Sequence, residues 1–249
     1  MKRVLVLLTI SLLLTAGCSP QRKETTLKVY VGAGLRKAVD QIAEAFYQTS
    51  GIQLELDYGG SGIIISKARL DHSADLFIPG DVSYVDRLHE LENCVLEKAA
   101  LCKFTPVMIT AKGNPYDIRS IADFSQKNLK VGLGKASACR IGKVGDKLLS
   151  NYGIKRESLT AVQESLTVNE LGVWVKMNSV DVSVVWDAVA YAIEEDVEII
   201  AIPDSKNVIS TVVAGRLATS KHPDEAKRFM TFLKSGQCRE ILKANGYGR

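Results

Sequence analysis

The chain has 249 residues, of which 46% are hydrophobic and 24% charged, as expected for a folded globular protein rather than a disordered segment. Its formal net charge is +4, and loss of Lys2 and Arg3 with a cleaved leader would lower this charge to +2. No run of basic residues remains after that loss, which argues against a nucleic-acid partner.

The first predicted element is an export signal. Two basic residues precede an apolar stretch from Val4 to Leu14, which is shorter than the roughly 20 residues that a membrane-spanning helix needs. Small residues then lead to Cys18, as at a bacterial lipoprotein cleavage site. We predict a signal peptide over residues 1–17, a lipid on Cys18 and a polar tether over 18–26. If Cys18 is incidental to an ordinary signal peptide, the mature protein still acts outside the cytoplasm.

After the tether, short apolar runs alternate with amphipathic stretches. The spacing of the apolar residues separates strands from helices, and glycine or proline marks several of the ends. About 225 residues remain, which is one large domain or two lobes of about a hundred residues each. In chain order, the first half contains predicted strand 27–31, helix 35–50, strand 52–58, helix 63–70, strand 75–79, helix 84–92 and strand 105–111.

The second half repeats this alternation after a turn at residues 112–115. Alternating strands and helices are typical of an α/β fold with largely parallel strands. The predicted elements are strand 130–133, helix 141–151, helix 169–177, strand 180–186, strand 198–202, an apolar run at 208–217, a helix beginning at Pro223 and a last short helix before residue 245.

Small or hydroxyl residues form four junctions between strands and helices, at 32–34, 59–62, 136–138 and 167–168. Each junction would present free backbone N–H groups at the start of a helix. The carboxyl ends of the strands in an open α/β sheet face a common crevice, so these helix starts can converge on one ligand. Because helix N-termini favour negative charge, the pattern predicts an anion-binding site. A fully deprotonated oxyanion needs hydrogen-bond donors only.

These junctions also have simpler interpretations. Thr167 and Glu170 form a capping box, which indicates a helix start and only secondarily a binding site. The glycines of residues 59–62 could serve only a mobile turn. An enzyme is less well supported, because Ile63 occupies the position at which a nucleophile elbow around Ser61 would need glycine.

The sequence offers no pattern for a bound metal cation or cofactor. The three histidines lack ligand-like spacing and no Cys-x-x-Cys pair exists. Five acidic residues near strand ends could bind a hard cation, although solvation or capping explains most of them; they are Asp57, Asp75, Asp81, Glu170 and Asp187.

Four cysteines remain if Cys18 carries lipid. In an oxidising compartment they could pair in three ways, and Cys94 with Cys102 closes the shortest loop. The alternative is that these two, Cys139 and Cys238 are buried free thiols.

In their order along the chain, several of these segments resemble those of the periplasmic molybdate-binding proteins of ABC transporters. The resemblance is carried by Val31–Leu35, Tyr58–Gly62, Ala74–Ile78, Ala226–Leu233 and the closing Gly246-Tyr247. It covers nearly the whole mature chain.

The resemblance implies a type II periplasmic binding protein fold with two lobes. Each lobe would be a mixed sheet flanked by helices, and two segments would cross between the lobes near Val107 and Val212. The implied boundaries are 27–107 plus 212–249 for lobe 1 and 108–211 for lobe 2.

The resemblance also implies five ligand-binding positions for an oxyanion between the lobes. Ser61 keeps the family's hydroxyl, while Ala138 and Val168 would donate their backbone amides. Gly34 stands where the family has its first serine and Trp186 where it has a tyrosine. These two differences put the size of the pocket and its ligand in question.

Cys139 and Arg140 follow the third junction, where small or apolar residues are expected. The pocket's charge is therefore open as well.

The leading hypothesis is an extracytoplasmic solute-binding protein of an ABC importer, not an enzyme. It would capture a tetrahedral oxyanion, molybdate or tungstate, as a monomer without a cofactor, and deliver it to a permease and its ATPase. It would be anchored to the cell membrane through Cys18 and face the periplasm or exterior. One alternative is a surface lipoprotein of the same fold that binds a metal cation or a protein partner. A hydrolase that uses Ser61 is the third possibility considered.

Overall fold

The structure is a computed structural model that describes residues 25–126 and 128–248. The predicted signal peptide, Cys18 and all but the last two residues of the tether lie outside the described residues, so lipidation stays a prediction. None of the described helices is long and apolar enough to cross a membrane.

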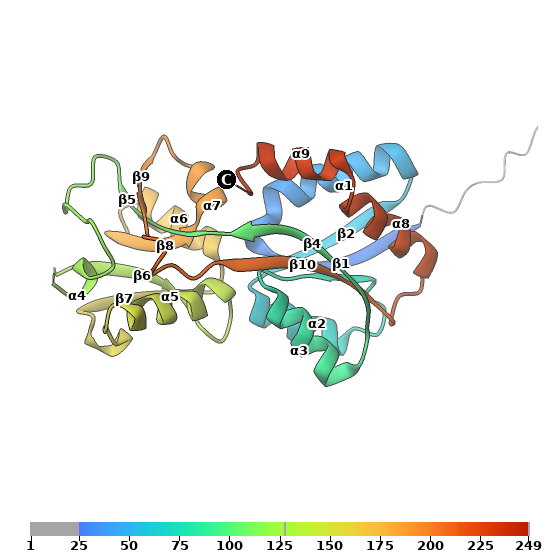
Figure 1. The fold of residues 1–249 in the computed structure, drawn as a ribbon, viewed down its shortest axis with the longest axis horizontal. Coiled ribbons are helices and arrows are strands. Elements are labelled where there is room, and N and C mark those ends of the chain that lie inside the picture. The colour runs from blue at the N-terminus through green and yellow to red at the C-terminus, as the bar shows by residue number, and fades with distance from the viewer. Residues whose placement is uncertain (1–24, 127, 249) are drawn as a thin grey trace, which may run out of the picture.

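The first lobe is built on a five-stranded sheet with the order β2-β1-β3-β10-β4. β1 runs parallel to β2 and β3, whereas β10 is antiparallel to β3 and β4 (Figure 1). Its strands are β1 (Thr26–Gly32), β2 (Gln53–Gly59), β3 (Leu76–Ile78), β4 (Val95–Phe104) and β10 (Ser210–Leu217). Its helices are η1 (Ala33–Leu35), α1 (Arg36–Ser50), α2 (Ser61–Leu70), α3 (Val82–Glu92), α8 (Pro223–Leu233) and α9 (Gly236–Ala244).

The second lobe has a sheet of the same size, with the order β7-β6-β8-β5-β9. β6 is parallel to β7 and β8, and β5 is antiparallel to β8 and β9. The strands are β5 (Pro106–Ala111), β6 (Lys130–Gly134), β7 (Ala161–Ser165), β8 (Val182–Trp186) and β9 (Val197–Ala201). The helices are α4 (Asp123–Gln126), α5 (Arg140–Asn151), η2 (Arg156–Ser158), α6 (Val168–Lys176) and α7 (Asp187–Tyr191).

Helices cover both faces of each sheet, as the amphipathic stretches predict. In the first lobe, α1, α8 and α9 lie on one face and α2 and α3 on the other (Figure 1). The apolar face of α1 packs inward, where Phe46 contacts Phe229 of α8 with ring centroids 4.9 Å apart. Gly51, with φ at 69°, ends α1 in the left-handed conformation that glycine adopts readily. The prediction of two mixed α/β lobes is confirmed.

The chain crosses between the lobes twice. The first crossing is short, because β4 ends at Phe104 and β5 begins at Pro106; the second runs from the end of β9 to Ser210. Val107 already pairs with strands of the second sheet, whereas Ser210 and Thr211 pair with β4 of the first. The lobe boundaries predicted from the sequence therefore differ from the sheets by one or two residues.

The sequence interpretation missed two strands, β4 and β7. Both are edge strands, and many of their residues are exposed. An edge strand is covered on fewer sides and can carry charged residues, so neither strand shows the apolar run that identified the central strands.

β4 also decides between the two interpretations of the cysteines. Cys94 immediately precedes this strand and Cys102 lies within it. At about 3.3 Å per residue, eight residues of extended chain span roughly 25 Å, far beyond the reach of a disulfide. All four described cysteines are free thiols, and Cys94, Cys139 and Cys238 are buried.

Candidate functional site

The carboxyl ends of the parallel strands of both sheets meet between the lobes. A small cavity of about 20 Å³ lies there, only slightly larger than the volume that one water requires on this measure. None of the described residues around it is acidic. They are Gly32, Ala33, Gly34, Gly59, Gly60, Ser61, Gly80, Phe104, Cys139, Arg140, Ile141, Val168 and Trp186.

Ser61 supplies the hydroxyl on the first-lobe side. It is the first residue of α2 and is only 3% exposed. Its Oγ accepts a hydrogen bond from the Gly80 amide at 3.0 Å, which leaves the hydroxyl proton available to a ligand. This bond connects the β2–α2 and β3–α3 junctions and holds Ser61 at the cavity.

Gly60 and Gly62 allow the backbones of the two lobes to approach closely. A Cβ atom on Gly60 would lie 2.4 Å from the carbonyl oxygens of Ala138 and Leu166, and one on Gly62 would lie 2.0 Å from that of Ser137. These distances are too short for any side chain. The glycines therefore have a specific steric role, beyond the mobile turn that the sequence also permitted.

The first turn of α2 is bonded directly to the second lobe. The amides of Gly62 and Ile63 donate to the carbonyl oxygen of Ala138, at 2.9 Å and 3.3 Å. The positive end of one lobe's helix thus meets a carbonyl of the other. This is a closed arrangement of the lobes.

Ala138 is the predicted site residue that does not line the cavity. Its amide donates to the Lys135 carbonyl at 2.9 Å within a turn, so it is occupied inside the second lobe. α5 begins after this turn, at Arg140. The cavity is lined instead by Arg140 and Ile141, whose amides belong to the first helical turn and lack intrahelical acceptors.

Val168 occupies the equivalent place at the start of α6, where it is buried and lines the cavity. Half of the predicted capping box is present, because Glu170 accepts from the residue before the N-cap rather than from Thr167. Thr167 Oγ1 accepts from the Glu170 amide at 3.4 Å, and the Glu170 carboxylate accepts from the Leu166 amide at 2.9 Å. The cap holds the helix start in place, and the Val168 amide, at the first helical position, lacks an intrahelical acceptor.

Gly34 and Trp186 are in contact across the lobes. A Cβ atom on Gly34 would lie 2.9 Å from Cδ1 and 3.2 Å from Nε1 of the indole, and 3.2 Å from Cγ1 of Val168. Trp186 is 2% exposed and stacks on Phe104, with ring centroids 4.8 Å apart. The indole ring therefore occupies the space that a side chain at residue 34 would need.

Arg140 brings a positive charge to the site. The sequence analysis noted this residue only as unexpected at its position. Its guanidinium bonds to Asp81 at 3.3 Å and to Ser210 Oγ at 2.9 Å. Asp81 caps α3 in the first lobe, so this largely buried ion pair joins the two lobes. The neighbouring Cys139 stays neutral at physiological pH, because burial raises the pKa of its thiol to about 11.

The remaining acidic candidates have structural partners. Asp57 pairs with Lys67 at 2.8 Å, the Asp75 carboxylate accepts from the Lys28 amide at 2.7 Å, and Asp187 accepts from the Ala188 amide at 2.9 Å. Within residues 25–126 and 128–248, no three His, Cys, Asp or Glu side chains gather as metal ligands. The chemistry gathered at the cavity consists of hydroxyl, amide, indole and guanidinium donors.

Comparisons with known proteins agree with this architecture. The family model described as bacterial extracellular solute-binding protein matches residues 27–248. A relative from Haemophilus influenzae, described as a binding protein, is 30% identical over 222 residues, which are 89% of this chain and 90% of the relative. The molybdate-binding protein ModA of Mycobacterium tuberculosis is 23% identical over 231 residues, 92% of this chain and 87% of that protein.

The solved structures show the same fold. The periplasmic molybdate-binding protein of Azotobacter vinelandii matches with a TM-score of 0.79 at 18% identity, over 90% of this chain and 99% of that one. At this identity the likeness concerns the arrangement of the two lobes and does not by itself identify a ligand.

Proposed function

The chain belongs to the bacterial extracellular solute-binding protein family, and from this premise we propose that it captures a tetrahedral oxyanion between its lobes. Solute-binding proteins of this kind serve ABC transporters, and the relatives are binding proteins rather than enzymes. Molybdate or tungstate is the proposed ligand. The name of the relative from Mycobacterium tuberculosis supports molybdate.

The observation that carries the proposal is the convergence of donors on one cavity that has no acidic lining residue. Ser61 contributes a hydroxyl, Trp186 an indole N–H, and α5 and α6 contribute their first turns. Each helix start favours an anion by about 0.3–1 kcal/mol. Arg140 adds a full positive charge, part of which Asp81 already balances.

Capture requires the lobes to separate and close again. The cavity of the closed arrangement, about 20 Å³, is only slightly larger than one water requires on this measure. The two crossing segments are the places where the backbone can bend. Contacts that join the lobes directly, such as Gly62 to Ala138 and Arg140 to Asp81, then stabilise the closed form.

Delivery to a permease and its ATPase follows from the family. We propose that a lipid on Cys18 keeps the monomeric protein at the outer face of the cell membrane. A tether of this kind raises the effective concentration of the loaded protein at its permease without tighter contacts. Mass spectrometry of the mature N-terminus tests the lipid, and an unmodified Cys18 would refute this part.

The test of the ligand is calorimetry on a soluble form that begins at Ser19. Molybdate, tungstate, sulfate, phosphate and divalent cations are titrated under identical conditions. Binding of molybdate or tungstate in preference to the other solutes supports the proposal. Heat with a cation but with no oxyanion would instead support a lipoprotein that binds metal, and no heat with any oxyanion would refute the assignment.

A further inference from the structure

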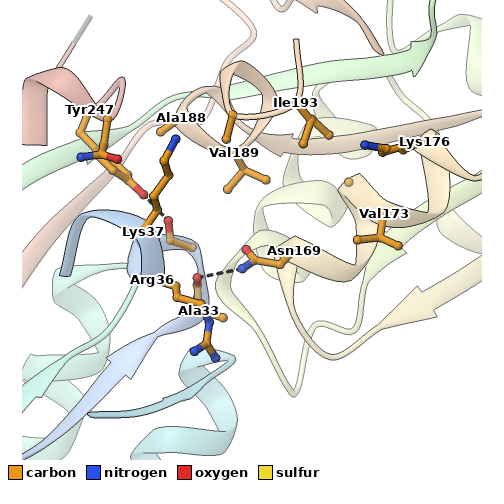
Figure 2. A pocket seen from close by; sticks show the side chains of 14 residues that line it. Ala33, Arg36, Lys37, Asn169, Val173, Lys176, Ala188, Val189, Ile193 and Tyr247 are labelled. Carbon is orange, nitrogen blue, oxygen red and sulfur yellow. Dashed lines mark hydrogen bonds between the residues drawn. The ribbon is translucent and has the colours of Figure 1, made fainter. Parts of the chain in front are cut away.

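Two further cavities lie between the lobes, and they differ in chemistry. One has a volume of about 220 Å³ and lies between the start of α1 and the helices α6 and α7 (Figure 2). Val189 and Ile193 give it an apolar wall, and beside it the Asn169 side chain donates to the Ala33 carbonyl at 3.2 Å. The other has a volume of about 430 Å³ and is lined by residues of α2, α3 and α5, which lie on one side of the molecule (Figure 1).

The larger of these cavities has a positively charged lining. Arg69, Arg87 and Lys143 line it and no acidic residue does, so we call it the basic cavity. Arg69 bonds to Glu92 at 2.7 Å through Nε, and Arg87 bonds to Glu90 at 3.2 Å through one terminal nitrogen. A guanidinium has five N–H donors, so each arginine keeps donors for a ligand. No residue lines both the basic cavity and the small cavity at the helix starts.

Lys143 and Tyr84 meet at the basic cavity from different lobes. The Lys143 ammonium lies 4.7 Å from the centre of the Tyr84 ring, and no carboxylate in the described part of the chain forms an ion pair with it. Tyr84 is 5% exposed, and its hydroxyl has no hydrogen-bond partner among residues 25–126 and 128–248. Burial raises the pKa of Tyr84 to about 12, so the hydroxyl stays protonated and can donate. A ligand acceptor would remove the cost of leaving this hydroxyl unsatisfied.

The basic cavity is complete only while the lobes are closed. Gly62 and Ser137 line it from opposite lobes, and a Cβ atom on Gly62 would lie 2.0 Å from the Ser137 carbonyl oxygen. The Gly62 amide also donates to the Ala138 carbonyl at 2.9 Å. Separation of the lobes breaks these contacts and moves Lys143 away from Tyr84. A ligand that needs donors from both lobes therefore binds the closed form in preference to the open one.

We propose that the basic cavity binds a phosphate ester and that this second ligand stabilises the closed lobes. Guanidinium groups bind phosphate in bidentate geometry, and the Lys143 ammonium and the Tyr84 hydroxyl add further donors. An apolar cavity of about 150 Å³ already holds benzene, so one of about 430 Å³ has room for an organic group beside the phosphate. Ile65 and Leu91 line the basic cavity and offer that group an apolar surface.

The two sites are coupled through closure. Since closure also accompanies capture of the oxyanion, each ligand raises the affinity for the other, and the effect is reciprocal. Couplings of this kind change an affinity by about 5-fold to 150-fold. The coupling rests on the proposed function, whereas binding of the phosphate ester at the basic cavity does not.

The test is calorimetry on the soluble protein that begins at Ser19, with glycerol 3-phosphate as the probe. The probe should bind to protein saturated with molybdate, and a saturating concentration of it should lower the Kd of molybdate by at least about fivefold. Lys143→Gln and Tyr84→Phe should each weaken binding of the probe by about tenfold or more, through loss of one donor to a charged acceptor. Tyr84→Phe keeps the ring that Lys143 contacts, so the Kd of molybdate alone should not change. Lys147→Gln removes the same charge from an exposed position of α5 outside the cavity lining and is the matched control, which should bind the probe normally.

A lipid head group presents the same chemistry as the free ester. Cosedimentation with phosphatidylglycerol vesicles, compared with phosphatidylcholine vesicles, is therefore the second arm of the test. Binding to phosphatidylglycerol that Lys143→Gln abolishes, without binding of free glycerol 3-phosphate, would support the cavity and identify the lipid as the source of the phosphate.

The outcomes separate this inference from the proposed function. If molybdate binds and neither form of the ester does, or if Lys143→Gln binds the ester normally, the inference is overturned and the proposed function stands. A rise in the Kd of molybdate would show competition at the small cavity, and an unchanged Kd would show that the sites are not coupled; either result overturns the inference. If the ester binds at the basic cavity and no inorganic oxyanion binds, the second site is supported and the proposed inorganic ligand is overturned.

Discussion

Gly34 and Trp186 allow a direct test of how the closed site is packed. Gly34→Ser places a hydroxymethyl group at the position where the family resemblance implies serine, but its Cβ would lie 2.9 Å from the indole and 3.2 Å from Val168. The three groups come from facing segments of the two lobes. The added atoms therefore obstruct closure more than they disturb either lobe alone.

The expected size of the effect follows from overpacking in a buried interface, about 1–3 kcal/mol. Since closure is coupled to binding, Gly34→Ser should weaken oxyanion binding by about 5-fold to 150-fold. Trp186→Tyr alone should also weaken it, because the smaller ring leaves space beside Gly34 and Phe104. The double variant refills that space and should recover much of the loss.

The assay is a double-mutant cycle measured by calorimetry, with the oxyanion that the unmodified protein binds most tightly. Thermal unfolding of each variant without ligand controls for damage to the lobes. A coupling free energy of at least about 1 kcal/mol in favour of the double variant is expected for residues in contact. Additive effects of the two substitutions would refute the steric explanation.

Three further predictions concern the site and the first lobe. Ser61→Ala should weaken oxyanion binding by about 1.5–3 kcal/mol in calorimetry, through loss of one donor to a charged acceptor; unchanged affinity would place the site elsewhere. Gly60→Ala should abolish binding while the unfolding temperature changes little, because its Cβ would lie 2.4 Å from two carbonyl oxygens of the facing lobe; normal binding would show that the lobes close differently. Although burial opposes it, the hydrogen bond from Lys28 lowers the pKa of Asp71 below its usual value. Asp71 thus contributes stability above the unfolded pKa near 4 that is lost as the pH falls further, and Asp71→Asn should reduce this acid dependence in denaturant melts at pH 7 and pH 3.

Much of the fold was predictable because the central strands and the main helices carry strong periodic signals. β1 and β8 are buried along most of their length and read as apolar runs, and α1 has a continuous apolar face. β4 and β7 lie at sheet edges, where exposure permits polar residues, and they left no such signal. The edge strands β2 and β9 were nevertheless predicted, because Leu54 and Leu56 alternate with polar residues in β2 and Ile199 and Ile200 form an apolar pair in β9.

The place of the candidate site in the fold was predictable, whereas the individual groups that line it were less so. The rule that strand ends face a common crevice predicted that the junctions lie together. Of the positions that the family resemblance implied, Gly34, Ser61, Val168 and Trp186 line the cavity, and their binding role stays a prediction. Ala138 does not, because a turn from residue 135 delays the start of α5 until Arg140. The sequence predicted this helix from residue 141, within one residue of its start, whereas the resemblance implied a donor two residues before that start.

The sequence by itself determined the α/β class, the order of the elements and the small residues at the junctions. These depend on local steric and hydrophobic preferences that act within a few residues. Only the tertiary structure decided what faces those junctions: the contact of Gly34 with Trp186, the Arg140–Asp81 pair and the cavity beside them. Each joins residues from different lobes, and such contacts depend on how two separately formed sheets are brought together.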